Sequence, residues 1–137
     1  MPEQSTRRQY PTRPESVAQV RTQVRELLAS RGIEPHGNES AENAVLVASE
    51  LAGNAVCHAS SSGSYSVTLE LHGGILAISV RDTEIETPPQ WPTLGDAGAT
   101  TGRGMFLVDA LARDWGCAHK GEGKVVWAEL LIDRERP

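Results

Sequence analysis

Hydrophobic residues recur with a helical period near the start of the chain. Valines and leucines stand three or four positions apart over 17–28, where Pro14 suits the first turn of a helix and Gly32 its C-terminal stop. The polar stretch 1–13 before this helix carries two prolines. It therefore predicts an N-terminal arm, or at most a short edge strand around 8–10.

A second helical pattern runs to about Ala59. The apolar residues of 44–56 follow the i, i+3, i+4, i+7 spacing of a helix packed on a core, and either Asn38 or Ser40 can cap its N-terminus. Gly53 interrupts this pattern at a cost of up to ~1 kcal/mol relative to alanine. Close approach of a backbone or a ligand would account for the glycine, and so would side-chain packing.

The second half of the chain contains two pairs of segments in which apolar and polar residues alternate. Segments 65–72 and 75–82 flank a Gly-Gly pair, which is the sequence form of a two-residue β-hairpin. Segments 115–119 and 124–133 form a second hairpin, and the apolar helical segment 105–112 precedes it. Antiparallel strands separated by helices predict an α+β fold, with the helices layered on one face of a sheet.

Length and composition restrict the classes of function. A chain of 137 residues fits one compact domain, so we expect residues 1–137 to fold as a single unit. The formal net charge is -5 and the basic residues are scattered, which argues against a nucleic-acid partner. No apolar run reaches the ~18 residues that span a bilayer, so we expect a cytoplasmic protein without a membrane partner. Cys57 and Cys117 lack disulfide or zinc-site spacing, and we expect reduced, buried thiols.

Three polar residues of the second helical pattern line one stripe. Glu50, Asn54 and His58 are spaced four positions apart, and each such step advances about 40° beyond a full helical turn. A carboxylate and a carboxamide beside an apolar face offer a hard-oxygen ligand for Mg²⁺ and a proton acceptor. The alternative is a solvated helix face, because Glu and Asn at this spacing are common exposed neighbours.

Asp82 stands at the end of the strand predicted over 75–82. Alternation places its carboxylate on the same side as the apolar residues of that strand, toward the core. A buried carboxylate needs hydrogen-bond donors, and the amine of a ligand would serve. Alternatively, Asp82 lies outside the strand and caps the following turn.

A stretch rich in proline and glycine, without a regular period, covers 83–101. Connections of this length in a small domain are more often lids or binding loops than linkers. The stretch leads into Gly102-Arg103-Gly104, immediately before an apolar helical segment. Glycines that open a helix expose backbone N–H groups to an anion such as phosphate. Neither the dinucleotide-binding pattern nor the P-loop pattern occurs in the chain.

In their order along the chain, these motifs resemble those of the GHKL (Bergerat-fold) ATPases. Residues 49–59 resemble the N-box of that family, 80–82 its first glycine-box aspartate and 101–108 its second glycine box. Trp115-Gly116 and 123–127 resemble its closing strands. Within the family, the chain is similar to the small stand-alone branch that includes the anti-sigma-factor serine kinases of bacteria.

The resemblance implies a two-layer α/β sandwich, the Bergerat fold, with a mixed, mainly antiparallel sheet and helices on one face. ATP would lie between the helices and the sheet. Asp82 would accept a hydrogen bond from the adenine amine, and Asn54 would hold Mg²⁺ against the phosphates. Gly102 and Gly104 would let the backbone of an ATP lid, 83–101, approach the phosphates.

The function that the resemblance implies is a serine/threonine-protein kinase. Glu50 would act as the general base, and Arg103 and His58 are candidate phosphate contacts. The γ-phosphate of Mg-ATP would pass to a serine of an anti-sigma-factor antagonist, with a sigma factor as a second candidate partner and a homodimer as a candidate assembly. The alternative is a non-catalytic regulatory module that sequesters a protein partner and has weak or vestigial nucleotide binding. One departure weighs toward that alternative, because 83–86 reads Thr-Glu-Ile-Glu where the family commonly places glycines.

Overall fold

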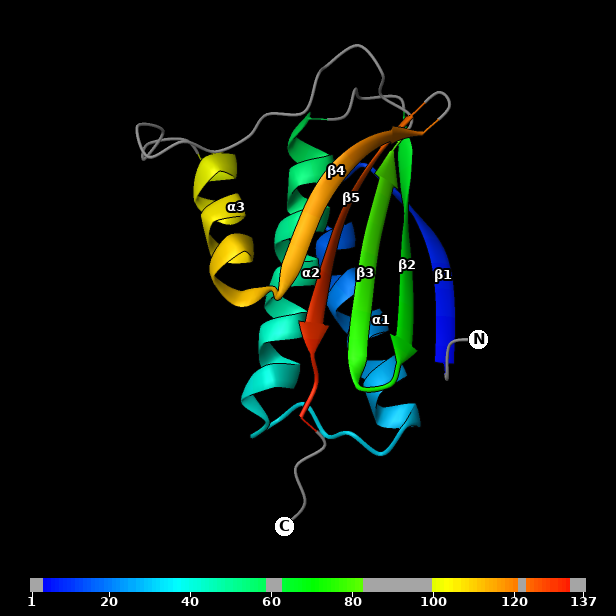
Figure 1. The fold of residues 1–137 in the computed structure, drawn as a ribbon. Helices are drawn as coiled ribbons and strands as arrows, with labels where there is room; N and C mark the ends of the chain where they lie inside the picture. Colours follow the sequence, from blue (N-terminus) through cyan, green and yellow to red (C-terminus); the bar gives the residue numbers. More distant parts are fainter. Residues whose placement is uncertain (1–3, 59–62, 83–99, 121–122, 134–137) are drawn as a thin grey trace.

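The computed structural model describes residues 4–58, 63–82, 100–120 and 123–133. Within these ranges, three helices pack against a five-stranded sheet (Figure 1). The elements in chain order are β1 (Gln4–Pro11), α1 (Ser16–Ser30), α2 (Glu39–His58), β2 (Ser64–His72), β3 (Ile75–Asp82), α3 (Thr100–Leu111), β4 (Asp114–Lys120) and β5 (Gly123–Leu131). The predicted α+β class and both predicted hairpins are confirmed.

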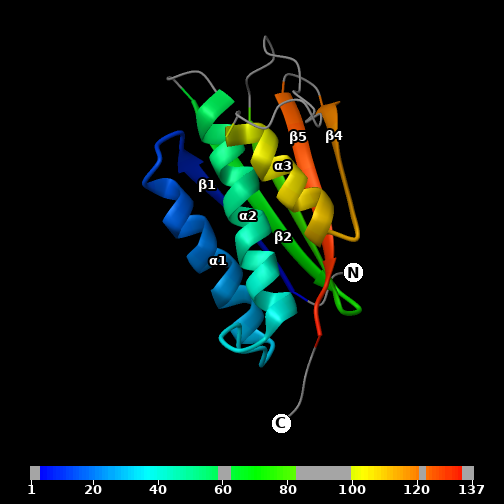
Figure 2. The same cartoon turned by 90° about the vertical axis from the view of Figure 1, so that its left-hand side faces the viewer.

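The strand order in the sheet is β1-β2-β3-β5-β4, and the helices lie on one face of it (Figure 2). Each pair of neighbouring described strands is antiparallel, so the mixed pairing implied by the resemblance is not found among them. In the turn between β2 and β3, Gly73 and Gly74 have φ angles of 59° and 83°. A two-residue turn of this kind requires such left-handed values, which glycine adopts without steric cost.

The core lies between the helices and the inner face of the sheet. In β2 and β3 every second side chain is buried, as the alternation of the sequence predicts. Burying one large aliphatic side chain contributes roughly 1.5–3 kcal/mol. Among the described residues, no helix combines the length and the apolar composition that crossing a membrane requires. The largest fully buried apolar side chains include Tyr65, Leu27, Leu28, Leu51, Leu69, Leu71, Leu76 and Ile78.

Asn38 caps the N-terminus of α2, and thereby decides between the two predicted caps. Its Oδ1 accepts a hydrogen bond from the Ala41 N–H at 3.1 Å. Its Nδ2 donates to the Asp133 carbonyl at 2.7 Å, and the Asp133 N–H donates to Ser40 Oγ at 2.8 Å. The cap therefore also fixes the chain just beyond β5 against the start of α2.

β1 is longer than the sequence predicted. The edge strand expected around 8–10 is confirmed, but its predicted length is wrong, because all eight residues of β1 pair with β2. Buried polar contacts hold this edge strand in place: the Tyr10 hydroxyl donates to Gln23 Oε1 at 2.7 Å, and Gln23 Nε2 donates to Thr6 Oγ1 at 3.0 Å and to the Val67 carbonyl at 3.2 Å. Polar composition alone does not reveal such a strand, since its stability comes from pairing and from contacts with α1.

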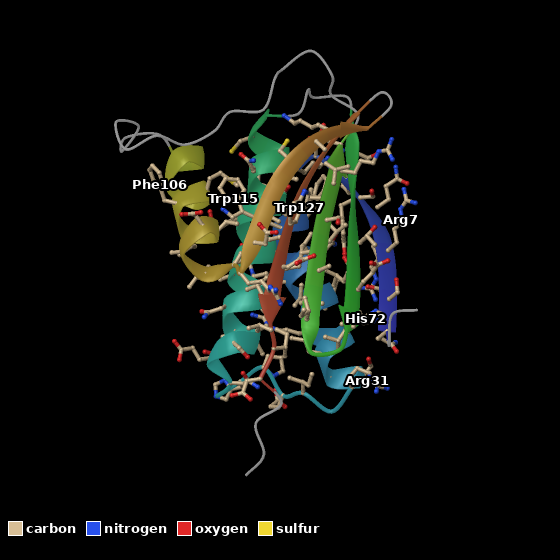
Figure 3. The ribbon with its side chains drawn as sticks, viewed as in Figure 1. Arg7, Arg31, His72, Phe106, Trp115 and Trp127 are labelled. Atoms are coloured by element: carbon tan, nitrogen blue, oxygen red, sulfur yellow. The ribbon has the colours of Figure 1, made fainter. Side chains whose placement is uncertain are left out.

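Two tryptophans fix the other edge of the sheet (Figure 3). The indole N–H of Trp115 on β4 donates to Asp109 Oδ1 at 2.7 Å, which ties β4 to α3. Trp127 on β5 lies across Gly116, its partner on β4. A Cβ at Gly116 would stand 2.8 Å from the indole Cζ2, closer than packed atoms approach. The glycine therefore makes room for the ring.

Candidate functional site

The candidate residues on α2 stand beside its buried face. Glu50 and Asn54 are half-buried, while Leu51, Ala52 and Ala55 between and beside them belong to the core. The Asn54 Nδ2 lies 4.0 Å from Met105 Sδ on α3. This contact brings the polar stripe of α2 to the glycine-containing start of α3.

Hard-oxygen groups on α2 are available to a cation. No hydrogen bond or ion pair joins the Glu50 carboxylate to another residue that the structure describes, and the same holds for Asn54 Oδ1. Mg²⁺ is commonly held by one or two such oxygens together with phosphates and waters. These two residues therefore fit a Mg²⁺ that arrives with a phosphate ligand.

Gly53 precedes Asn54 on α2 and is surrounded by open space. A Cβ built on it meets no heavy atom within 4 Å outside its own stretch of helix, among the residues the structure describes. Neither side-chain packing nor a described backbone accounts for this glycine. Of the two explanations that the sequence analysis gave for Gly53, the close approach of a ligand is therefore the one that agrees with the packing.

Asp82 is the last residue of β3 and is buried, with 4 % of its surface exposed. Every second side chain of β3 points toward the core, and Asp82 is the last of these. Its neighbours in the sheet are Tyr65 on β2 and Lys124 on β5. The open alternative, in which Asp82 lies outside the strand, is therefore wrong. A carboxylate in this apolar layer is an acceptor facing the helices.

Lys124 was missed by the sequence reasoning. It is the second residue of β5, directly opposite Asp82, and only 6 % of its surface is exposed. The signal was present, because Lys124 shares the inward parity of Ala128 and Leu130 in a strand that was predicted correctly. A carboxylate and an ammonium thus stand side by side at the same end of the sheet.

Cys117 on β4 borders this charged pair. Burial raises the pKa of the Cys117 thiol, the Lys124 charge lowers that pKa and the Asp82 charge raises it. Both charges therefore act on the same neighbourhood of the inner face. The expectation that both cysteines are buried is wrong, because Cys57 is exposed and Cys117 is half-buried. Cys57 lies outside the buried stripe of α2, on a side of the helix that faces solvent.

The glycine pair lies inside α3, where the sequence placed it in a loop before the helix. α3 begins at Thr100, so Gly102 and Gly104 belong to its first turns. The lid was predicted over 83–101, and its last two residues are therefore helical. Glycine costs least there, because the first four N–H groups of a helix have no intrahelical partner. The rest of the predicted lid lies outside the described residues, as do the side chains of Arg103 and His58.

These groups meet at one end of the molecule. The C-terminal turns of α2, the start of α3, the end of β3 and the start of β5 lie together at the top of Figure 1, and Figure 2 shows the same grouping. The arrangement offers unpaired N–H groups to an anion, oxygens to a cation and a buried acceptor–donor pair to a polar ring.

Comparison with known proteins places the whole chain in context. A family model described as histidine kinase-like ATPase domain matches residues 10–130. A search of curated proteins found no match. Among solved structures, the chain is similar to the RsbU and RsbW domains of Rv1364c from Mycobacterium tuberculosis, with a TM-score of 0.69 and 21% identity, over 98% of this chain and 34% of that chain.

Two further structures come from the Erythrobacter litoralis EL346 blue-light activated histidine kinase. One has a TM-score of 0.53 and 28% identity, over 69% of this chain and 31% of that chain. The other, the histidine kinase domain, has a TM-score of 0.54 and 19% identity, over 89% of this chain and 61% of that chain. The chain thus spans about a third of the first two solved chains, and likeness at these low identities shows a shared fold.

Proposed function

The chain belongs to the histidine kinase-like ATPase domain family, and from that premise we propose that it binds Mg-ATP and acts as a serine/threonine-protein kinase. The substrate is a serine of an anti-sigma-factor antagonist, in the cytoplasm, with a sigma factor as a second protein partner and a homodimer as its assembly. The observation that carries the proposal is the meeting of Asn54, Asp82 and the start of α3 at one end of the sheet.

Each group in the site takes one role in phosphoryl transfer. Asp82, buried at the end of β3, accepts a hydrogen bond from the exocyclic amine of adenine. The first N–H groups of α3, with Gly102 and Gly104, receive the phosphates, and Arg103 and His58 are further phosphate contacts. Asn54 holds Mg²⁺, which when bound would neutralise charge on the phosphates.

Glu50 is the proposed general base. It stands one helical turn before Asn54, and no described residue competes for its carboxylate. A base so placed takes the proton of a serine hydroxyl as the hydroxyl oxygen attacks the γ-phosphorus, and the bond from that phosphorus to the β–γ bridging oxygen breaks to release ADP. The protein substrate is inferred from the resemblance to anti-sigma-factor kinases, and the half-buried Glu50 keeps part of its surface exposed.

A transfer assay with Glu50→Gln tests the kinase. A general base contributes typically about 10²–10⁴-fold to rate and little to ground-state affinity. We therefore expect the variant to lose transfer of labelled phosphate from ATP to the partner protein by at least about 10²-fold while its Kd for Mg-ATP stays within about twofold.

Glu39→Gln is the matched control, since Glu39 is exposed at the opposite end of α2 and should transfer phosphate normally. Equal rates for Glu50→Gln and the unmodified protein would refute the base assignment. A protein that binds Mg-ATP and its partner but transfers no phosphate would replace the kinase with a non-catalytic regulatory module.

A further inference from the structure

Lys124 is a buried lysine whose ammonium has no hydrogen bond or ion pair within the part of the chain that the structure describes. Its exposed fraction is 6 %, and lysine is almost never buried to this extent unless its ammonium is paired. No described residue forms a hydrogen bond or an ion pair with it, and the ion pair that the described residues do contain joins Arg8 and Glu26, at the β1 edge of the sheet. Among the described residues, the ammonium therefore lacks the acceptor that burial demands.

The neighbourhood of Lys124 belongs to the proposed base pocket. Lys124 and Asp82 are register partners on β5 and β3, so their Cβ atoms are about 4.5–5.5 Å apart on the same face. Both charges act on the thiol of Cys117, which faces the same layer from β4. A ligand group held by Asp82 would therefore lie within reach of the Lys124 side chain.

An acceptor at Asp82 and a donor at Lys124 match the hydrogen-bonding groups along one edge of adenine. The exocyclic amine of adenine is a donor, and the ring nitrogens on either side of it, N1 and N7, are acceptors. With the amine at Asp82, an adjacent ring nitrogen faces a donor at Lys124. Guanine in the same position would set a carbonyl oxygen against the Asp82 carboxylate, which is a repulsive contact.

We infer that Lys124 is a second base-contacting residue, which donates a hydrogen bond to N1 or N7 of adenine beside the Asp82 contact. The inference rests on the proposed function, because it assigns a second base contact within the same nucleotide site. It also explains why an ammonium is retained in a buried position, since the nucleotide supplies the missing acceptor.

Deaza nucleotides test this contact directly. The Kd values of ATP, 1-deaza-ATP and 7-deaza-ATP should be measured with the unmodified protein and with Lys124→Met, which keeps an unbranched side chain of similar volume. For the unmodified protein, we expect one of the two analogues to bind about 10- to 100-fold more weakly than ATP, because a charged donor is left unpaired. Lys124→Met should bind ATP more weakly by a similar factor and should no longer distinguish ATP from that analogue.

Arg81→Met is the matched control. Arg81 precedes Asp82 but stands exposed on the outer face of β3, so its removal takes one cation from the same end of the sheet without touching the inner face. Its nucleotide affinities should stay within about twofold of those of the unmodified protein. Circular dichroism of Lys124→Met should show an unchanged fold, since the substitution removes a buried charge.

The results separate the two claims. If the unmodified protein binds ATP and both deaza analogues equally well, the Lys124 contact is overturned while the nucleotide site stands. If Lys124→Met still discriminates against the same analogue, another residue makes the contact and the inference also falls. If the unmodified protein binds no Mg-ATP, the proposed function itself fails and this inference falls with it.

Discussion

At the scale of the single residue, Asp82 connects strand geometry to base recognition. Its carboxylate is held in the apolar layer because it keeps the inward parity of β3 to the last residue. Asparagine in its place would keep the size of the side chain but would turn an acceptor-only group into one that also donates. Position and chemistry at Asp82 can therefore be separated by substitution.

Asp82→Asn should weaken ATP binding by about tenfold or more and should reduce the preference for ATP over GTP, because the amide need not accept from the adenine amine. Fluorescence titration with both nucleotides measures the two affinities, and thermal unfolding checks that stability is nearly unchanged. Equal binding of ATP and GTP by the unmodified protein would show that Asp82 does not read adenine.

Two glycines give opposite expectations for the same substitution. Gly116→Ala places a Cβ against the Trp127 ring, so we expect a loss of about 1–3 kcal/mol in the free energy of unfolding. Gly53→Ala meets no described atom and should instead raise that free energy by up to about 1 kcal/mol through helix propensity. Urea unfolding followed by tryptophan fluorescence measures both, and a stable Gly116→Ala would mean that Trp127 moves aside freely.

At the scale of the element, α1 and the strands beneath it are joined through buried hydroxyl groups. Tyr10 on β1 hydrogen-bonds Gln23 on α1, and Tyr65 on β2 hydrogen-bonds Ser16 at the start of α1. The two tyrosine rings lie 5.7 Å apart between centroids. Burial raises the pKa of each phenol above the ordinary value of 10.0.

These raised pKa values predict a loss of stability in alkali. The unfolded tyrosines lose their protons from about pH 10, while the folded ones keep them, so the unfolded state binds fewer protons. The free energy of unfolding should therefore be independent of these groups below about pH 9 and should fall as the pH rises through the unfolded value. Urea unfolding between about pH 8 and pH 11 should show a shallower fall for the double variant Tyr10→Phe, Tyr65→Phe. Identical slopes would contradict the prediction.

Periodicity explains which elements the sequence could predict. The hairpin of β2 and β3 and the helices α1 and α2 follow from regular apolar spacing and from the glycines at their turns and ends. β1 was underestimated because an edge strand exposes most of its side chains and takes its stability from pairing with β2. The start of α3 was misplaced because glycines mark a helix terminus only to within a few residues.

The site residues that the sequence could predict are those that a pattern within one helix or strand reveals. Glu50 and Asn54 share a helix face, so spacing alone brought them together. The inward position of Asp82 was one of two open alternatives, because a strand end cannot be located from alternation alone. The inward position of Lys124 could be read from its parity with Ala128 and Leu130. Its place opposite Asp82 could not, because it depends on the pairing of β3 with β5, and the two residues stand 42 positions apart.

At the scale of the whole molecule, the topology gathers separate motifs at one end of the sheet. Antiparallel pairing in the order β1-β2-β3-β5-β4 sets the end of β3 beside the start of β5, and the packing of α3 on α2 brings Met105 to Asn54. A nucleotide bound there would contact elements from most of the chain. Its binding should therefore stabilise the fold as a whole, by about 2.7 kcal/mol at a ligand concentration of 100 times Kd.

The central claim is that this end of the sheet binds Mg-ATP, and titration calorimetry with the unmodified protein and with Asn54→Ala tests it most directly. We expect the unmodified protein to bind Mg-ATP, to bind it much more weakly when EDTA removes the Mg²⁺, and to show a higher Tm in the complex. Asn54→Ala should fold normally and should lose the Mg²⁺-dependent part of the affinity, while the control Asn43→Ala, near the other end of α2, should behave like the unmodified protein. A folded protein that shows neither heat of binding nor a shift in Tm with Mg-ATP, or an Asn54→Ala variant with unchanged Mg²⁺ dependence, would contradict the account.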